Sequence, residues 1–395
     1  NVRFSTYQYD STGRALSSEL AGGTSKYSVA YNTDGSSTVT DPLNTARTYS
    51  YQSVLGVPRT TAIAGSACPA CGPASTSYDT NGFVASRTDW NGNLTTYLRL
   101  DPGGRLDLET SRTEASGSTK ERTITTQWHP TFRLPALITE PGRTTGFTYD
   151  GAGNMLTKTV TDTATSSART WTYTYNSIGQ VLTVDGPRTD VSDVTTYAYD
   201  SATGNLLSVT NAAGHITQIT SYDANGRPLT VVDPNGLTTT LTYAPRGWLT
   251  SRKVGGETTI YDYDFAGQLT KVTLPDSSFL EYVYDPAHRL TEIHDNLGNK
   301  IVYTLDNMGN RTAENVRDPG NNLAQTRARV YNSLNRLIQD IGATNPATQI
   351  TQYGYDSQGN LTTITDPLSH VTTNGYDALN RLVQVTAPGP TLTAY

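Results

Sequence analysis

The chain is built from short runs in which apolar and polar residues alternate, and turn-forming residues break these runs at regular intervals. Residues 229–233 and 237–243 are two such runs, rich in Leu, Val, Thr and Tyr. Alternation with a period of two is typical of a half-buried strand, and branched or aromatic side chains suit a pleated surface. The pattern therefore predicts two short strands in each interval, joined by tight turns.

A turn signature follows the tyrosine that ends the first strand of an interval. In residues 222–227 a side-chain acceptor stands directly after the tyrosine, and a glycine stands three positions later. This order is typical of a type I turn that a left-handed glycine closes in a bulge. We expect Gly→Val at these glycines to impair folding more than changes in the loop around Ser116. The predicted structural repeat turns include Asp223 with Gly226, Asp264 with Gly267, and Asp356 with Gly359.

The same unit repeats along the whole chain. Five successive copies open at residues 222, 243, 263, 284 and 305, which lie 21, 20, 21 and 21 residues apart. From Tyr9 to Tyr376 the unit recurs in about seventeen registers, spaced by roughly 20–28 residues, and a fixed period in this range indicates a repeat architecture. We therefore predict a single array over residues 1–395, more divergent over 1–148 and more regular over 149–395. The predicted fold class is all-β, with antiparallel hairpins joined into one long sheet.

Two further features bear on the geometry of this sheet. The longer intervals carry their extra residues after the returning strand, so we expect the extended loops to line one edge. These loops are residues 65–75, 113–120, 162–167, 318–322 and 343–348. Paired tyrosines such as Tyr282 and Tyr284 are two apart and share a face, whereas Leu290 and Ile293 are three apart and would face opposite sides without a bulge.

Composition favours a thin sheet over a thick core. Of 395 residues, 35% are hydrophobic and 16% are charged, with 34 glycines and 19 prolines. The net charge of −6 argues against nucleic acid as a partner, because phosphate binding uses clustered Lys and Arg. No run reaches the length of about 18 apolar residues that a membrane span requires. The chain begins at Asn1, and we expect it to be part of a larger polypeptide.

Cys68-Pro-Ala-Cys71 is the sharpest local chemical motif. Its spacing suits a local disulfide, a zinc site or redox exchange. Zinc needs two further ligands, and the five histidines show no paired spacing. A local structural disulfide or a pair of inert thiols is therefore the favoured interpretation for Cys68 and Cys71.

The many aspartates invite a calcium interpretation, because hard cations prefer oxygen ligands. Each Asp after Tyr, however, stands at the first position of a turn, where its carboxylate can accept backbone N–H groups. No pair of carboxylates stands out as a glycosidase pair, and the glycines do not form a phosphate loop. We expect no catalytic residue, no metal site and no cofactor.

The phrase Tyr-Asp-x-x-Gly-Asn/Arg-Leu, seen at 149–156 and 355–361, with Asp-Pro-x-Gly at 233–236, resembles the YD repeat of the Rhs family. That family includes bacterial Rhs polymorphic toxins, the shell subunits of insecticidal ABC toxin complexes, and teneurins. The resemblance implies a sheet that spirals into a hollow shell, which in the toxins encloses a C-terminal effector. It also implies a bacterial secreted or cell-surface protein. The family's self-cleaving segment is not matched, because Asp318-Pro319-Gly320 and Asp366-Pro367-Leu368 are repeat turns.

The function that these features favour is structural: a non-catalytic segment of a YD-repeat shell that encapsulates a toxin or other cargo for delivery. The expected partners are the remainder of the parent shell and its enclosed C-terminal effector, and a secretion-system component is a further candidate. The alternative is a cell-surface module that binds glycans or a protein through its rim loops and through Trp90, Trp171 and Trp248.

Overall fold

The computed structural model describes residues 4–99, 101, 103–105, 107–342, 349–389 and 392–394. These residues form 35 β-strands and two 3-10 turns, and none of them lies in an α-helix. All the strands belong to one 35-stranded sheet. The predicted all-β fold of antiparallel hairpins is therefore confirmed.

The strands are short, and most span five to nine residues. In the first third of the chain they are β1 Ser5–Tyr9, β2 Ala15–Leu20, β3 Tyr27–Tyr31, β4 Ser37–Thr40, β5 Ala46–Val54, β6 Val57–Gly65, β7 Ser75–Tyr78, β8 Val84–Thr88, β9 Leu94–Leu98, β10 Ser111–Ser116 and β11 Arg122–Trp128. The central strands are β12 Pro135–Glu140, β13 Arg143–Tyr149, β14 Met155–Asp162, β15 Ala168–Tyr175, β16 Val181–Asp185, β17 Thr195–Tyr199, β18 Leu206–Thr210, β19 Ile216–Tyr222, β20 Pro228–Val232, β21 Thr238–Tyr243, β22 Leu249–Val254, β23 Glu257–Tyr263 and β24 Leu269–Thr273. The last strands are β25 Phe279–Tyr284, β26 Leu290–Asp295, β27 Lys300–Leu305, β28 Arg311–Arg317, β29 Leu323–Tyr331, β30 Leu337–Ile341, β31 Ile350–Tyr355, β32 Leu361–Thr365, β33 Val371–Tyr376, β34 Leu382–Thr386 and β35 Leu392–Ala394. The 3-10 turns are η1 Ala21–Gly23 and η2 Pro69–Cys71.

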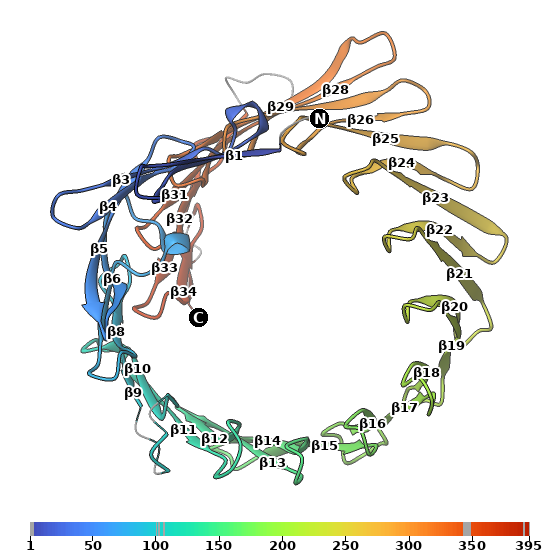
Figure 1. Cartoon of the computed structure of the whole chain (residues 1–395), viewed down its shortest axis with the longest axis horizontal. Coiled ribbons are helices and arrows are strands. Elements are labelled where there is room, and N and C mark those ends of the chain that lie inside the picture. The colour runs from blue at the N-terminus through green and yellow to red at the C-terminus, as the bar shows by residue number, and fades with distance from the viewer. Residues whose placement is uncertain are drawn as a thin grey trace. The chain divides into compact units, whose positions relative to one another are not determined.

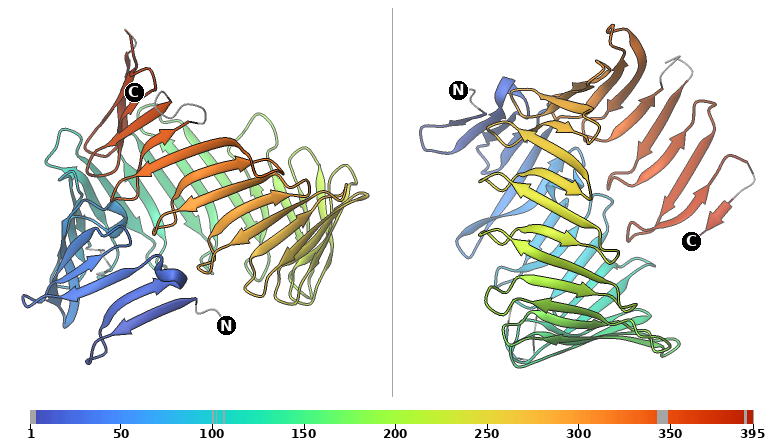
Figure 2. Two further views of the ribbon diagram at one scale, coloured as in Figure 1. Left: turned by 90° about the horizontal axis from the view of Figure 1, so that it is seen from above. Right: turned by 90° about the vertical axis from the view of Figure 1, so that its right-hand side faces the viewer.

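The chain divides into two compact units. Unit 1 comprises Asn1–Tyr97, Thr113–Arg122 and Leu280–Tyr395, and unit 2 comprises Leu98–Arg112 and Thr123–Phe279. Within unit 2, each strand from β11 to β24 pairs antiparallel with the next strand in the sequence. Figure 1 shows this order as a gradual change of colour from strand to strand, and the right-hand view of Figure 2 shows the same strands side by side. Within unit 1, β25 to β35 pair in the same way.

Two kinds of turn alternate along the sheet. The turns after odd-numbered strands follow the repeat tyrosine or its substitute, and we call them Tyr-Asp turns. The turns after even-numbered strands are called return turns. The predicted loops 65–75, 162–167 and 318–322 follow even-numbered strands, so they leave the ladder at the end where the return turns lie. The predicted loop 113–120 is wrong in its first half, because residues 113–116 belong to β10 and residues 117–121 make the connection to β11. The fifth predicted loop, 343–348, lies outside the described residues.

A β-bulge after most Tyr-Asp turns sets which side chains share a face. Tyr284 pairs with Leu290 and Tyr282 pairs with Ile293, because residue 291 is left out of the register. Leu290 and Ile293 therefore lie on the tyrosine face despite their spacing of three. The face that carries the tyrosines is the more covered one, as the alternation of half-buried and exposed residues along β15 shows.

Little of the sheet is deeply buried. Six hydrophobic residues of the described chain fall in the buried class, and no large side chain is completely enclosed. A sheet that is covered on one face by its own tyrosines, leucines and valines accounts for this distribution, because each such side chain keeps part of its surface in solvent. The buried hydrophobic residues are Ile63, Leu108, Ala115, Ile124, Ala287 and Tyr303.

Candidate functional site: the Tyr-Asp turns

The Tyr-Asp turn after β19 shows how the repeat phrase folds. The backbone N–H of Gly226 donates to the carbonyl oxygen of Asp223 at 3.0 Å, and the N–H of Asp223 donates to the carbonyl of Arg227 at 3.0 Å. Gly226 has a φ of 75°, which lies in the left-handed region that favours glycine. The Asp223 carboxylate accepts the N–H groups of Asn225 at 2.9 Å and Arg227 at 3.0 Å. The aspartate therefore stabilises its own turn by accepting backbone N–H groups within it.

The other predicted turns have the same geometry. Asp264 accepts the backbone N–H of Gln268 and the side-chain amide of the same residue, at 2.9 and 2.6 Å. Asp356 accepts the backbone N–H and the side-chain amide of Asn360, each at 2.8 Å. Gly359 has a φ of 98°. These carboxylate oxygens are occupied by hydrogen bonds within their own turns, which gives the aspartates a structural role.

The electrostatics agree with that role. The pKa of Asp223 is lowered mainly by the backbone hydrogen bond from Arg227, which favours the ionised carboxylate. Partial burial acts to raise the pKa of Asp264, but the hydrogen bonds from Gln268 outweigh it and leave this pKa lowered. Asp356 shows the same balance, with hydrogen bonds from Asn360 and Asn91 opposing the effect of burial on its pKa. These carboxylates are held ionised, which is opposite to what a general acid requires.

The residue at the fifth position of a Tyr-Asp turn links that turn to the next one along the same edge. Gln180 donates its side-chain amide to the carbonyl of Gly204 at 2.8 Å, and Arg289 donates to the carbonyl of Asp306 at 2.7 Å. Arg336 donates to the carbonyl of Asp356 at 2.9 Å. These contacts were not predicted from the sequence. Its signal is the recurrence of Arg, Asn or Gln at one position of the repeat.

The repeat tyrosine connects each hairpin to the preceding one. Its ring lies on the covered face, and its hydroxyl donates to a carbonyl oxygen in the preceding even-numbered strand. In six hairpins of the described chain that carbonyl belongs to the first residue of the strand, opposite a bulge. The pairs are Tyr31 to Ala15 at 3.0 Å, Tyr149 to Pro135 at 2.8 Å, Tyr175 to Met155 at 2.8 Å, Tyr222 to Leu206, Tyr355 to Leu337 at 2.9 Å and Tyr376 to Leu361 at 3.0 Å.

Within unit 1, Tyr-Asp turns also contact return turns that are far away in the sequence. Asn91, in the return turn after β8, donates its side-chain amide to Asp356 at 3.0 Å and accepts the backbone N–H of Gln358 at 3.1 Å. Asn380 donates to Asp89 at 3.1 Å. The left-hand view of Figure 2 shows the N-terminal strands in blue and the C-terminal strands in orange and red, to which these turns belong. Side chains and turn backbone, rather than strand pairing, carry these contacts.

The structure places Cys68 and Cys71 in a disulfide at η2. Cys71 is exposed and Cys68 is half-buried. The carbonyl of Gly72, directly after the disulfide, accepts the indole N–H of Trp90 at 2.9 Å. Through this bond the disulfide loop supports the return turn that holds Trp90 and Asn91. The backbone N–H of Trp90 in turn donates to the Gln358 side chain at 2.9 Å.

The other candidate tryptophans are also engaged within the sheet. Lys158 lies over the ring of Trp171, 5.5 Å from its centroid. Trp248 packs against Tyr263 with ring centroids 5.5 Å apart, and Arg246 lies over its ring. Both rings are half-buried. These contacts give the rings a packing role on the sheet.

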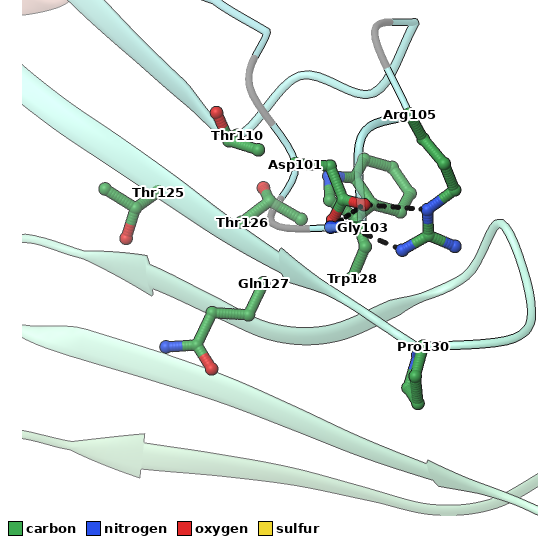
Figure 3. Close-up of a pocket in the computed structure, with 9 residues that line it drawn as sticks. All are labelled: Asp101, Gly103, Arg105, Thr110, Thr125, Thr126, Gln127, Trp128 and Pro130. Atoms are coloured by element: carbon green, nitrogen blue, oxygen red, sulfur yellow. Dashed lines mark hydrogen bonds and ion pairs between the residues drawn. The ribbon is translucent and has the colours of Figure 1, made fainter.

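A cavity of about 610 Å³ lies in unit 2 beside the loop that precedes β10. Figure 3 shows Asp101 and Arg105 facing one another at this cavity, with the ring of Trp128 behind them. Arg105 Nε donates to Asp101 at 2.8 Å, and this hydrogen bond lowers the pKa of Asp101. The indole N–H of Trp128 donates to the carbonyl of Glu109 at 2.8 Å. The charged residues that line the cavity, Asp101 and Arg105, therefore neutralise one another. This arrangement does not favour acid–base chemistry in the cavity.

The described residues hold neither a grouped metal site nor a membrane-spanning helix. No three of the His, Cys, Asp and Glu side chains there are grouped as a metal ion would require. No helix in that part of the chain has the length and apolar character needed to cross a bilayer.

Comparisons with known proteins identify this architecture. The family model described as teneurin YD-shell matches residues 140–314, and the one described as RHS repeat matches residues 331–371 and 355–391. No curated protein sequence matches the chain.

Among solved structures, the chain resembles TcdB2-TccC3-TEV, with a TM-score of 0.66 and 18% identity over 96% of this chain. It also resembles the Tc holotoxin pore of Photorhabdus luminescens, with a TM-score of 0.68 and 17% identity over 96% of this chain. A TcdB2-TccC3 structure gives a TM-score of 0.53 and 15% identity over 99% of this chain. The chain spans only 22%, 22% and 27% of those three chains. The recurring Tyr-Asp turns, the two family models and the shared fold lead to one conclusion: the chain carries Rhs/YD-type repeats over residues 140–314 and 331–391 and has the YD-shell fold.

Proposed function

We propose that this chain is a non-catalytic wall segment of a secreted YD-repeat shell, and that the shell encloses a C-terminal effector of its parent polypeptide for delivery. The observation that carries the proposal is the way the sheet uses its polar groups. Turn aspartates close individual hairpins, and fifth-position side chains and repeat tyrosines bind neighbouring hairpins to one another. The polar groups of the repeat thus serve to stabilise the sheet that forms the wall.

The comparisons support the same role. Two solved structures with this fold are TcdB2-TccC3-TEV and a Photorhabdus luminescens Tc holotoxin pore that carries a mutation in TccC3. The pKa values of Asp223 and Asp264 are lowered by hydrogen bonds within their turns, which suits a structural role better than acid–base catalysis. The parent shell and its effector are therefore the partners we assign to the chain.

Limited proteolysis of the parent polypeptide tests this function. We expect the segment after the repeats to resist protease while the sheet is folded, and to be digested once mild denaturant opens the sheet. The same segment expressed alone serves as the control and should be digested at once. Equal digestion of the segment in the intact parent and in isolation would contradict enclosure.

A further inference from the structure

Two side chains from elsewhere in unit 1 anchor the loop that holds the disulfide, residues 65–75. On one side of η2, Arg47 Nε donates to the carbonyl of Ser66 at 3.0 Å. On the other side, the indole N–H of Trp90 donates to the carbonyl of Gly72 at 2.9 Å. The disulfide lies between these two anchors, so it restricts where the second carbonyl can lie.

The strand ladder contributes little to holding this loop. The loop joins β6 to β7, and among the described residues the register of those two strands holds one pair, Ala62 with Ser75. The backbone N–H of Ile63 adds a hydrogen bond to the carbonyl of Ala74 at 2.9 Å. A segment with few ladder bonds opens more readily than the rest of a sheet. The position of the Gly72 carbonyl therefore depends on the disulfide.

The bond from Trp90 continues into contacts between parts of unit 1 that are far apart in the sequence. Its backbone N–H donates to Gln358, and Asn91 binds both Gln358 and Asp356. Asn380 donates to the same return turn. We call this set of contacts the clasp. Because hydrogen bonds weaken steeply as their angles worsen, a shift of the return turn weakens all of them together.

We propose that the Cys68–Cys71 disulfide is a thiol-exchange site that regulates the clasp, with small thiols of the glutathione class as its reactants. Cys71 is exposed and Cys68 is half-buried, so a thiolate reaches the sulfur of Cys71 first. That sulfur bonds to the reductant, the bond between the two cysteines breaks, and Cys68 leaves with the electron pair and takes a proton from water. A second thiol attacks the reductant's sulfur in the mixed disulfide, which releases Cys71 as a thiol and the reductant as its own disulfide. Two thiols thus lose two electrons and two protons, and the protein disulfide gains them.

Reduction of this site loosens the clasp. The Gly72 carbonyl is no longer held in place, so the indole of Trp90 loses its acceptor and the return turn moves more freely against Gln358 and Asp356. Disulfides persist outside cells and are reduced in the cytosol. A chain that passes from the first compartment to the second therefore exchanges a firm clasp for a loose one. This inference requires no enclosed effector.

Hydrogen exchange of the full chain, with and without reduced glutathione, tests the site. The chain has two cysteines and both are in this disulfide, so the reductant has no other target. We expect exchange at residues 89–93 and 356–360 to accelerate about fivefold, the effect of losing one hydrogen bond, while residues 223–227 stay unchanged. Brief exposure with iodoacetamide present, followed by mass spectrometry, should find glutathione on Cys71 and the alkyl group on Cys68.

Trp90→Phe tests the route from the disulfide to the clasp. It keeps an aromatic ring but removes the indole donor, so exchange at residues 356–360 should be faster without reductant and should not respond further to glutathione. Trp171→Phe is the matched control, because Trp171 packs with Lys158 in unit 2, and its response should equal that of the wild type. Circular dichroism shows whether each variant is folded, and the wild-type comparison decides the matter if Trp90→Phe is not.

Several results would overturn the proposal. One is a disulfide that stays intact in glutathione, and another is glutathione found mainly on Cys68. A reduced, folded chain with unchanged exchange at residues 356–360 would also overturn it, as would a folded Trp90→Phe variant that still responds in full. Equal acceleration at residues 223–227 would show general unfolding in place of a local effect. None of these outcomes bears on protection of an effector.

Discussion

At the scale of the residue, the fourth position of each turn fixes the backbone geometry of the hairpin. Glycine usually stands there with a positive φ, but His288, Asn335 and Asn380 occupy it with φ values of 62°, 64° and 58°. Asparagine and histidine tolerate the left-handed region better than branched residues do. The sequence predicts the turns at the glycine positions, because Asp and Gly act locally. The stacking of His288 on Phe4 depends on a contact distant in the sequence and was not foreseen.

Substitutions at the fourth position should separate backbone strain from crowding. Gly226→Val is expected to cost about 1–3 kcal/mol of unfolding free energy, because valine must adopt a positive φ. Gly267→Val should cost more, since a Cβ there would lie 2.7 Å from the ring of Trp248. Gly226→Asn should be nearly neutral. Denaturant unfolding measures all three, with Ala224→Ser as a control within the same turn, and equal losses for valine and asparagine would contradict the assigned turn.

Acid should destabilise the sheet through its turn aspartates. The pKa values of Asp223, Asp264 and Asp356 are lowered in the folded chain, so the unfolded chain binds protons more readily. Their contribution to stability is complete above the ordinary Asp pKa of about 3.9 and is lost as the pH falls through the lower folded values. Melting temperatures measured from pH 6 downward, at about one-unit steps, should fall in that acid range. Asp223→Asn should flatten the fall, whereas a melting temperature independent of acid would argue against ionised turn caps.

At the scale of the element, the repeat tyrosine joins one hairpin to the preceding one. Sequence parity shows that the tyrosines share a face, yet the partner of each hydroxyl follows from the bulge, which shifts the register by one residue. A bulge of this kind is encoded by the turn geometry and is hard to locate from alternation alone.

Tyr149→Phe tests the hydroxyl contact between hairpins. It removes the donor to the Pro135 carbonyl and should cost about 1 kcal/mol of unfolding free energy. Tyr173→Phe is the matched control, because the described part of the chain offers its hydroxyl no hydrogen-bond partner. Denaturant unfolding provides the measurement, and equal effects of the two substitutions would show that the hydroxyl contact contributes nothing.

The disulfide at η2 should act locally. Replacing Cys68 and Cys71 by Ser should lower stability by about 2 kcal/mol at most, because the closed loop is very short. The change should appear at the return turn that the Gly72–Trp90 hydrogen bond supports. Amide exchange of residues 89–93 and 356–360 should accelerate in the variant, while residues 223–227 serve as the internal control. Unchanged exchange at residues 89–93 would mean that the loop does not support this turn.

At the scale of the whole molecule, the order of pairing was predictable and the long-range docking was not. Each hairpin is specified by adjacent residues, so a fixed period is enough to predict that neighbours pair. The contact of Asn91 with Asp356 joins residues 265 apart, and no pattern in the sequence marks it.

Hydrogen exchange followed by mass spectrometry tests most directly whether the repeats form one continuous ladder. A sheet in which each hairpin pairs with the next should protect both strands of every hairpin from β11 to β24, with fast exchange confined to the turns and loops. If the repeats were independent hairpins, each strand would pair on one side only, and alternate amides along every strand would exchange as fast as in an unfolded chain. We expect the first result, and the second would contradict a continuous ladder.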